Sequence, residues 1–90
     1  MNTYIVTYDL KNPGQNYEAL IKIIHSYSAW ARLGDSAYVI TSKLNAASVR
    51  DKLIKVLDNN DKLFVGKVNA PAAWYGLSEE VSDWLKTNLK

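Results

Sequence analysis

The sequence contains no cysteine among its 90 residues. This absence excludes disulfide bridges, thiolate metal sites and cysteine nucleophiles, and it agrees with the reducing cytoplasm that we expect as the location. No apolar run approaches the roughly 18–20 residues of a membrane span, and the N-terminus lacks a basic segment followed by an apolar one. We therefore expect no membrane partner.

The sequence also has only one histidine and a small net charge. His25 is the only histidine, so one chain cannot build a His–His metal pair or a histidine-based catalytic triad. Eleven Lys and Arg against nine Asp and Glu leave a formal charge of +2, which permits nucleic-acid binding without indicating it. Glycine-rich phosphate loops, zinc-ligand spacings and serine-nucleophile motifs are missing too. The apolar content of 48% is that of an ordinary globular chain, and the length allows one domain with one core.

The first apolar run, Thr3–Leu10, is rich in β-branched and aromatic residues and is stopped by Asn12-Pro13-Gly14. This composition favours a strand followed by a turn. Neither alternate face of the run is polar, which is typical of a central strand that is covered on both sides. The strand ends in a carboxylate, Asp9.

Periodicity and capping residues define the remaining elements. In chain order they are a helix capped by Asn16 and running to about Tyr27, a hairpin of Ser28–Leu33 and Ala37–Ser42 around Gly34-Asp35-Ser36, a helix capped by Asn45 over Ala46–Asp58, a strand Lys62–Val68, and a last helix capped by Ser78.

This order predicts an α+β, ferredoxin-like βαββαβ fold, with a four-stranded antiparallel sheet and two helices on one face. Residues 1–68 would form this core, and residues 69–90 a C-terminal extension whose helix packs on the core or on a partner, all in a single domain. The first, third and fourth strands are apolar on both faces, so the second face of the sheet needs a cover. We expect the C-terminal segment and a second copy to share that role, which makes a homodimer.

Asp9 is the most suggestive functional residue. A carboxylate at the end of a central strand can bind a hard cation such as Mg²⁺, and in a two-fold dimer it could meet its symmetry mate. An aspartate after a strand also commonly turns or caps the next loop, and the residue alone favours this structural interpretation.

A second group of candidates follows the hairpin and the aromatic residues. Arg32 and Ser36 flank the turn and could hold a phosphate, with Lys11 as a further nucleic-acid contact, although a solvated arginine and a turn serine explain them as well. Aromatic side chains could stack on bases but more often form cores or interfaces. For the dimer interface we expect Tyr8, Tyr38, Trp74 and Tyr75.

Two segments resemble a known family. The strand Tyr4-Ile5-Val6-Thr7-Tyr8-Asp9-Leu10 and the hairpin Arg32-Leu33-Gly34-Asp35-Ser36-Ala37-Tyr38-Val39 resemble those of the small CRISPR-associated protein of the spacer-acquisition complex, CRISPR-associated protein 2. The resemblance covers about Thr3 to Val68 and extends to a sister branch, the virulence-associated toxin-like ribonucleases. The chain differs in having only Lys11 where the family has a basic cluster, and a tryptophan-rich helix at its end, which suggests a stand-alone relative.

The resemblance implies a homodimer packed through its sheets, with Asp9 at a divalent-metal position for phosphodiester hydrolysis. It also implies a phosphate-facing Arg32, with Ser36 and Tyr38 at the hairpin positions. The leading hypothesis is therefore a Mg²⁺-dependent endonuclease acting on RNA or DNA. The alternatives are a catalytically silent dimer that binds nucleic acid or protein, and a toxin–antitoxin component.

Overall fold

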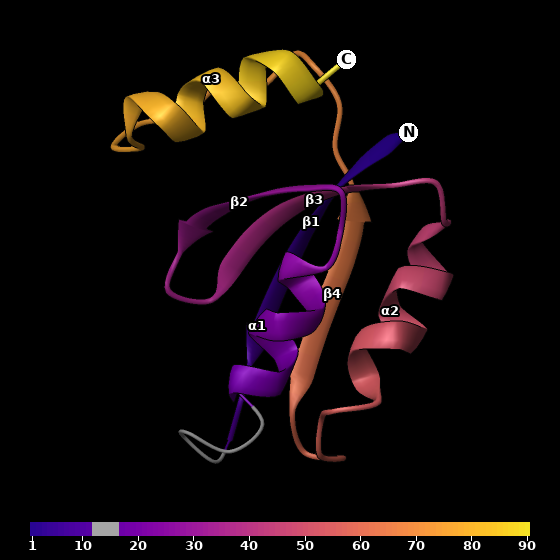
Figure 1. Ribbon diagram of the computed structural model, residues 1–90. Helices are drawn as coiled ribbons and strands as arrows, with labels where there is room; N and C mark the ends of the chain where they lie inside the picture. Colours follow the sequence, from indigo (N-terminus) through magenta and orange to yellow (C-terminus); the bar gives the residue numbers. More distant parts are fainter. Residues whose placement is uncertain (12–16) are drawn as a thin grey trace.

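The computed structural model describes residues 1–11 and 17–90 of the chain. Its elements, in chain order, are β1 (Asn2–Asp9), α1 (Tyr17–His25), β2 (Ala29–Gly34), β3 (Ala37–Ser42), α2 (Ala46–Ile54), β4 (Lys62–Lys67) and α3 (Glu79–Asn88). The predicted α+β, ferredoxin-like fold is confirmed, with α3 added after the fourth strand (Figure 1). The expected turn at Asn12-Pro13-Gly14 and the expected cap Asn16 lie outside the described residues.

The four strands form one antiparallel sheet in the order β2-β3-β1-β4. The strand β1 is therefore central, as its two apolar faces predicted. It pairs with β3 from Asn2 opposite Ser42 to Thr7 opposite Ala37, and with β4 as far as Asp9 opposite Lys62. The open edges of the sheet are β2 and β4.

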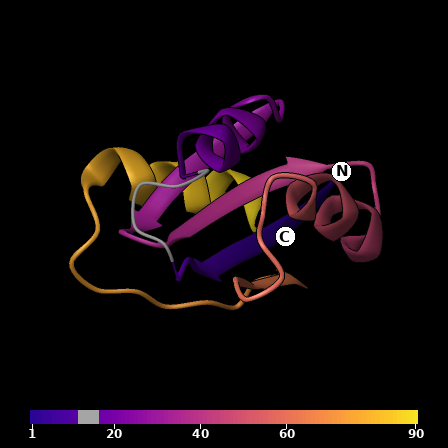
Figure 2. The same ribbon diagram turned by 90° about the horizontal axis from the view of Figure 1, so that it is seen from below.

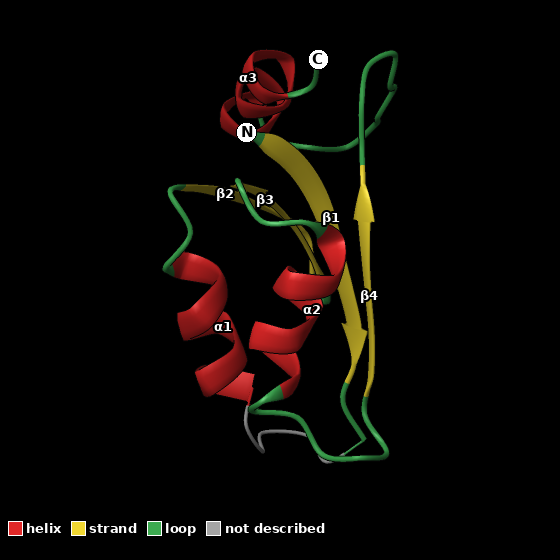
Figure 3. Ribbon diagram, turned by 90° about the vertical axis from the view of Figure 1, so that its right-hand side faces the viewer, coloured by secondary structure: helices red, strands yellow, loops and turns green. Residues whose placement is uncertain are grey.

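One face of the sheet lies beneath α1 and α2, which Figure 3 shows on the same side of β1 and β4. Because side chains alternate along a strand, Tyr4, Val6 and Tyr8 of β1 all point to this face. They pack with Leu20 and Ile24 of α1, and with other residues of β3 and α2, into the main core. We call this side the helix face.

The opposite face, called here the outer face, is covered only in part. Leu85 of α3 is buried against Ala31 of β2 and Val39 of β3, and the partly buried Trp74 and Trp84 pack around them. Seen from below, α3 lies across the sheet from α1 (Figure 2). Phe64, on the outer face of β4, remains 62% exposed. The predicted C-terminal cover therefore exists in this chain, and it protects the β2–β3 half of the face.

Two helices end earlier than the sequence predicted. Helix α1 ends at His25 instead of about Tyr27, and α2 ends at Ile54 instead of about Asp58. After each end the backbone N–H groups bond to carbonyls three residues back, as from Tyr27 to Ile24 at 3.2 Å. These tighter turns keep the apolar side chains facing the core while the α-helical hydrogen bonds stop.

The expected caps of the later helices are confirmed. The Asn45 side chain accepts a hydrogen bond from the Ser48 N–H at 2.8 Å, and the Ser78 hydroxyl accepts one from the Val81 N–H at 3.1 Å. Each bond satisfies a backbone donor that the first helical turn leaves open. None of the helices that the structure describes combines the length and apolar character needed to cross a membrane.

Candidate functional site

Asp9 lies at the exit of the central strand, on the outer face. Its carboxylate is 3.2 Å from the Lys11 ammonium, and its side chain is 61% exposed. Lys62 of the neighbouring strand β4 is the residue that pairs directly with Asp9. The backbone N–H of Lys11 donates to the Asp61 carboxylate at 2.9 Å, which fixes the chain as it leaves β1. Asp9 is thus an accessible carboxylate with a lysine beside it in the chain and another opposite.

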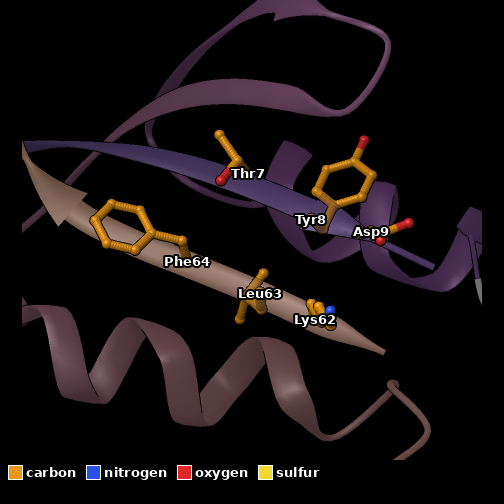
Figure 4. Close-up of a pocket in the computed structure, with 6 residues that line it drawn as sticks. All are labelled: Thr7, Tyr8, Asp9, Lys62, Leu63 and Phe64. Carbon is orange, nitrogen blue, oxygen red and sulfur yellow. The ribbon is translucent and has the colours of Figure 1, made fainter. Parts of the chain in front are cut away.

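A shallow hollow runs from Asp9 along the seam between β1 and β4. Figure 4 shows its lining side by side on the two strands: Thr7, Tyr8 and Asp9 from β1, and Lys62, Leu63 and Phe64 from β4. One end of this lining is charged, at Asp9 and Lys62, and the other end is apolar, at Phe64. The hollow lies on the half of the outer face that α3 leaves open.

A single chain offers little for a divalent cation at this place. Within residues 1–11 and 17–90, no three His, Asp or Glu side chains come together as a ligand group. Magnesium accepts one or two carboxylates and completes its shell with water or phosphate oxygens. Asp9 fits the first of those ligands, and a second carboxylate would have to come from another chain.

Arg32 and Ser36 flank the hairpin turn as predicted, but the structure gives Arg32 a local role. Its Nε–H donates to the Gly34 carbonyl at 3.1 Å, and Nη2 is 3.3 Å from the Asp35 carboxylate. The Ser36 carbonyl accepts the Tyr8 N–H at 3.2 Å, which extends the β1–β3 ladder.

Arg32 and Asp9 lie on opposite faces of the sheet. Arg32 pairs with Tyr38, whose side chain belongs to the helix-face core, and paired residues in antiparallel strands share a face. Asp9 has the opposite parity to Tyr8, which also belongs to that core. Within one chain the predicted phosphate position and the predicted metal position therefore do not converge.

Tyr8 and Tyr38, predicted at a dimer interface, are buried in the core of the single chain at 6% and 5% exposure. The Tyr8 hydroxyl donates to the Tyr17 hydroxyl at 3.3 Å, and the two rings meet edge to face. Burial, followed by the hydrogen bond with Tyr17, strongly raises the pKa of the Tyr8 phenol. In the single chain, therefore, neither side chain offers a partner more than a trace of surface.

Trp74 and Tyr75, the other two expected interface residues, differ sharply in how much of each is exposed to solvent. The Trp74 indole N–H donates to the Ser82 hydroxyl at 3.0 Å, and the ring packs in the cluster beneath α3. Tyr75 is fully exposed. The turn that follows contains Gly76 at φ +83°, a left-handed conformation that glycine adopts without strain. Of this pair, Tyr75 alone is open to a partner.

Sequence reasoning missed the contact between His25 and Trp30. The imidazole at the end of α1 stacks on the indole of β2 with ring centroids 3.8 Å apart and planes 13° from parallel. Both residues are exposed, Trp30 by 39%. The only signal in the sequence is a histidine in the last helical turn five residues before a strand tryptophan, which does not fix a contact.

Comparison with protein-family models found no match to this sequence, and comparison with curated proteins found none either. The resemblance noted in the β1 and hairpin segments therefore stays a prediction from the sequence.

Proposed function

We propose that the protein is a homodimeric nucleic-acid-processing protein, related to the small CRISPR-associated nuclease family, in which two outer faces meet along their β1–β4 halves. The observation that carries this proposal is the uncovered half-face itself, with Phe64 at 62% exposure and Asp9 beside it. Burial of apolar surface is the main driving force for association, and aromatic side chains, phenylalanine included, are enriched in interfaces.

In such a dimer Asp9 of each protomer would approach the two-fold axis. Two carboxylates from symmetry mates would supply the second acidic ligand that a single Asp9 does not provide. The cation would activate water and neutralise charge on a phosphodiester, as divalent metals do in nucleases. Asp9 would hold the metal, while Lys11 and Lys62 would attract the phosphates of the substrate.

A second candidate, a dimer that binds nucleic acid without cleaving it, is favoured by the ion pair between Asp9 and Lys11. A carboxylate already paired with an ammonium at 3.2 Å has a simple structural role at the strand exit. Under this hypothesis the same lysines bind phosphates, and Asp9 serves only to hold Lys11 in place.

The Asp9→Asn variant separates the two candidates. We would follow cleavage of labelled single-stranded RNA and duplex DNA with Mg²⁺, Mn²⁺ or EDTA, and determine mass by light scattering. The nuclease hypothesis expects a dimer and metal-dependent cleavage that Asp9→Asn abolishes while binding remains. The matched control is Asp51→Asn, because Asp51 is another exposed aspartate with a cationic neighbour, Arg50 at 3.0 Å, on helix α2.

The outcomes differ for each candidate. Binding without cleavage by the unmodified protein would support the silent module. A strict monomer of about 10 kDa at high micromolar concentration, with neither binding nor cleavage, would overturn both.

A further inference from the structure

Strand β4 offers an open edge. Among the strands that the structure describes, it has a neighbour on one side only, which is β1. The backbone groups of successive residues in an antiparallel strand point alternately to its two sides. The N–H of Val68, just after β4, donates to the Thr3 carbonyl at 2.9 Å, so the even-numbered residues of the strand bond to β1. The N–H and C=O groups of Leu63, Val65 and Lys67 therefore point to the open edge.

A groove follows this edge on the helix face, between β4 and α2. It consists of two adjoining hollows of about 260 and 400 Å³, and both are lined by Arg50 and Leu63. Leu63 and Val65 point to the helix face because they pair with Tyr8 and Val6 of β1, and paired residues share a face. The apolar residues along the groove are Ala46, Ile54, Leu57, Leu63 and Val65. An apolar groove, in which Ile54 is 46% exposed, thus lies beside the open-edge backbone groups of β4.

The two ends of the groove carry opposite charge. Helix α2 runs in the opposite direction to β4 (Figure 1), so the start of the helix lies near the end of the strand. The positive end of the helix dipole and the exposed Lys67 lie there, and the first turn of α2 contains no acidic residue. At the other end Asp58 and Asp61 contribute to the lining, while Arg50, between the ends, is held in an exposed ion pair with Asp51. A ligand that fits the groove therefore has an acidic group near Lys67 and a basic group near Asp61.

We propose that the β4 edge and its groove bind an extended segment of another protein, which adds to the sheet as a strand antiparallel to β4. Strand addition of this kind uses backbone hydrogen bonds for affinity and side-chain pockets for selection, and β4 offers both. A second copy of β4 is the less suitable occupant, because the strand begins and ends with exposed lysines, Lys62 and Lys67, and edge lysines discourage pairing between copies. The surface lies at the side of the outer-face contact proposed above and does not involve Asp9.

The register defines the chemistry of the added segment. Its residues opposite Lys67, Val65 and Leu63 place their side chains on the helix face and their backbone groups against β4. The first of them is acidic, because it faces Lys67, and the next two are apolar, because they enter the groove. The following residue on that face lies opposite Asp61 and is basic. The residues between them have side chains on the outer face and N–H groups that point away from β4.

A blocked, fluorescein-labelled heptapeptide, Glu-Thr-Val-Thr-Val-Thr-Lys, is the probe, and fluorescence anisotropy measures its binding. We expect saturable binding below about 1 mM. N-methylation of the two valine amides, which face β4, should weaken binding at least about tenfold through lost hydrogen bonds and steric obstruction. N-methylation of the last two threonine amides, which face away, is the matched control and should change binding less than about twofold.

The charge of Lys67 gives a second test. Lys67→Glu should weaken binding about twofold to fivefold, and a peptide with lysine in place of its glutamate should recover the loss. Lys22→Glu is the control, because Lys22 is an exposed lysine on α1 and the substitution changes the net charge equally. It should bind both peptides as the unmodified protein does. Equal affinities of the two variants for the original peptide would overturn the proposed placement of the segment.

Hydrogen exchange locates the bound peptide on the strand. Exchange of the Leu63, Val65 and Lys67 amides should slow when the peptide is added, while the Phe64 and Gly66 amides, already bonded to β1, should not change. Absence of binding at about 1 mM, or equal weakening by both pairs of methyl groups, overturns the proposal. Protection of the same three amides that grows with protein concentration without peptide identifies a second copy as the occupant and also overturns it. None of these measurements depends on nucleic-acid binding or cleavage, so the proposed function is tested separately.

Discussion

The phenyl ring of Phe64 lies over Gly66, two residues further along β4. A β-carbon at position 66 would come within 2.7 Å of the ring. The absence of a side chain at Gly66 therefore shapes the open half of the outer face, because it lets the ring lie along the strand.

Gly66→Ala should displace the Phe64 ring without unfolding the chain. The ring is exposed and can rotate away, and alanine restricts the unfolded chain more than glycine does, so we expect the free energy of unfolding to change by less than about 1 kcal/mol. Self-association should weaken, because the displaced ring no longer presents the same surface. Sedimentation equilibrium of both proteins measures this, and unaltered association would place Phe64 outside any interface.

Phe64→Ser tests the same surface more strongly. Since the phenyl ring is mostly exposed in the single chain, its loss should cost the isolated fold about 1 kcal/mol or less, whereas a dimer buried on it should dissociate. Light scattering across a concentration series gives the association constant. Ile54→Ser is the control, since Ile54 is 46% exposed on helix α2, which covers the helix face (Figure 3), and an equal loss of association in both variants would contradict the proposed surface.

Tyr8→Phe should destabilise the protein and alter its response to alkali. Removing the buried hydroxyl loses its bond with Tyr17 and should cost about 1 kcal/mol at neutral pH. The folded pKa of Tyr8 lies above the unfolded value near 10, so its contribution is complete below pH 10 and is lost as the pH rises beyond it. Urea titrations between pH 8 and about 11.5 should therefore show a shallower alkaline fall for the variant. If the free energy of unfolding fell equally steeply with pH in both proteins, titration of Tyr8 would not account for the loss of stability in alkali.

Leu85→Ala should loosen α3 from the outer face. Leu85 is 4% exposed and is the buried residue of α3 in the second cluster, so its truncation should cost about 2–4 kcal/mol through lost burial and a cavity. Denaturant unfolding measures the loss, and hydrogen exchange shows whether the amides of α3 open first. Leu44→Ala provides the control, because Leu44 is 38% exposed and should cost less than half as much. Equal losses in the two variants would contradict the anchoring role of Leu85.

The fold could be predicted from the sequence because each element carries its own local signal. The alternation in β1, the cap at Asn45 and the cap at Ser78 each depend on neighbouring residues only, and the order of elements then allows few topologies. Helix ends were less predictable, since Val56 and Leu57 continue the apolar pattern of α2 after the α-helical hydrogen bonds have stopped.

The relative positions of the candidate site residues could not be predicted from the sequence. Arg32 and Asp9 point to opposite faces because of the strand register, and the register shifts between Arg32 and Gly34 at an irregularity that leaves no trace in the composition. Tyr8 and Tyr38 could serve a core or an interface equally well by residue type. Helices α1 and α2 pack over both side chains, and this packing places them in the core.

The hydrogen bond from the Thr3 hydroxyl to the Asn88 carbonyl, 2.7 Å long, joins residues 85 positions apart and brings the two ends of the chain together in Figure 1. β1 is the centre of the sheet, and its second neighbour, β4, follows it in the chain only after two helices and two strands. During synthesis the apolar faces of β1 therefore stay open until β4 has emerged. Helix α3 then packs on the outer face and bonds to β1, so the central strand is secured by elements that lie far from it in the sequence.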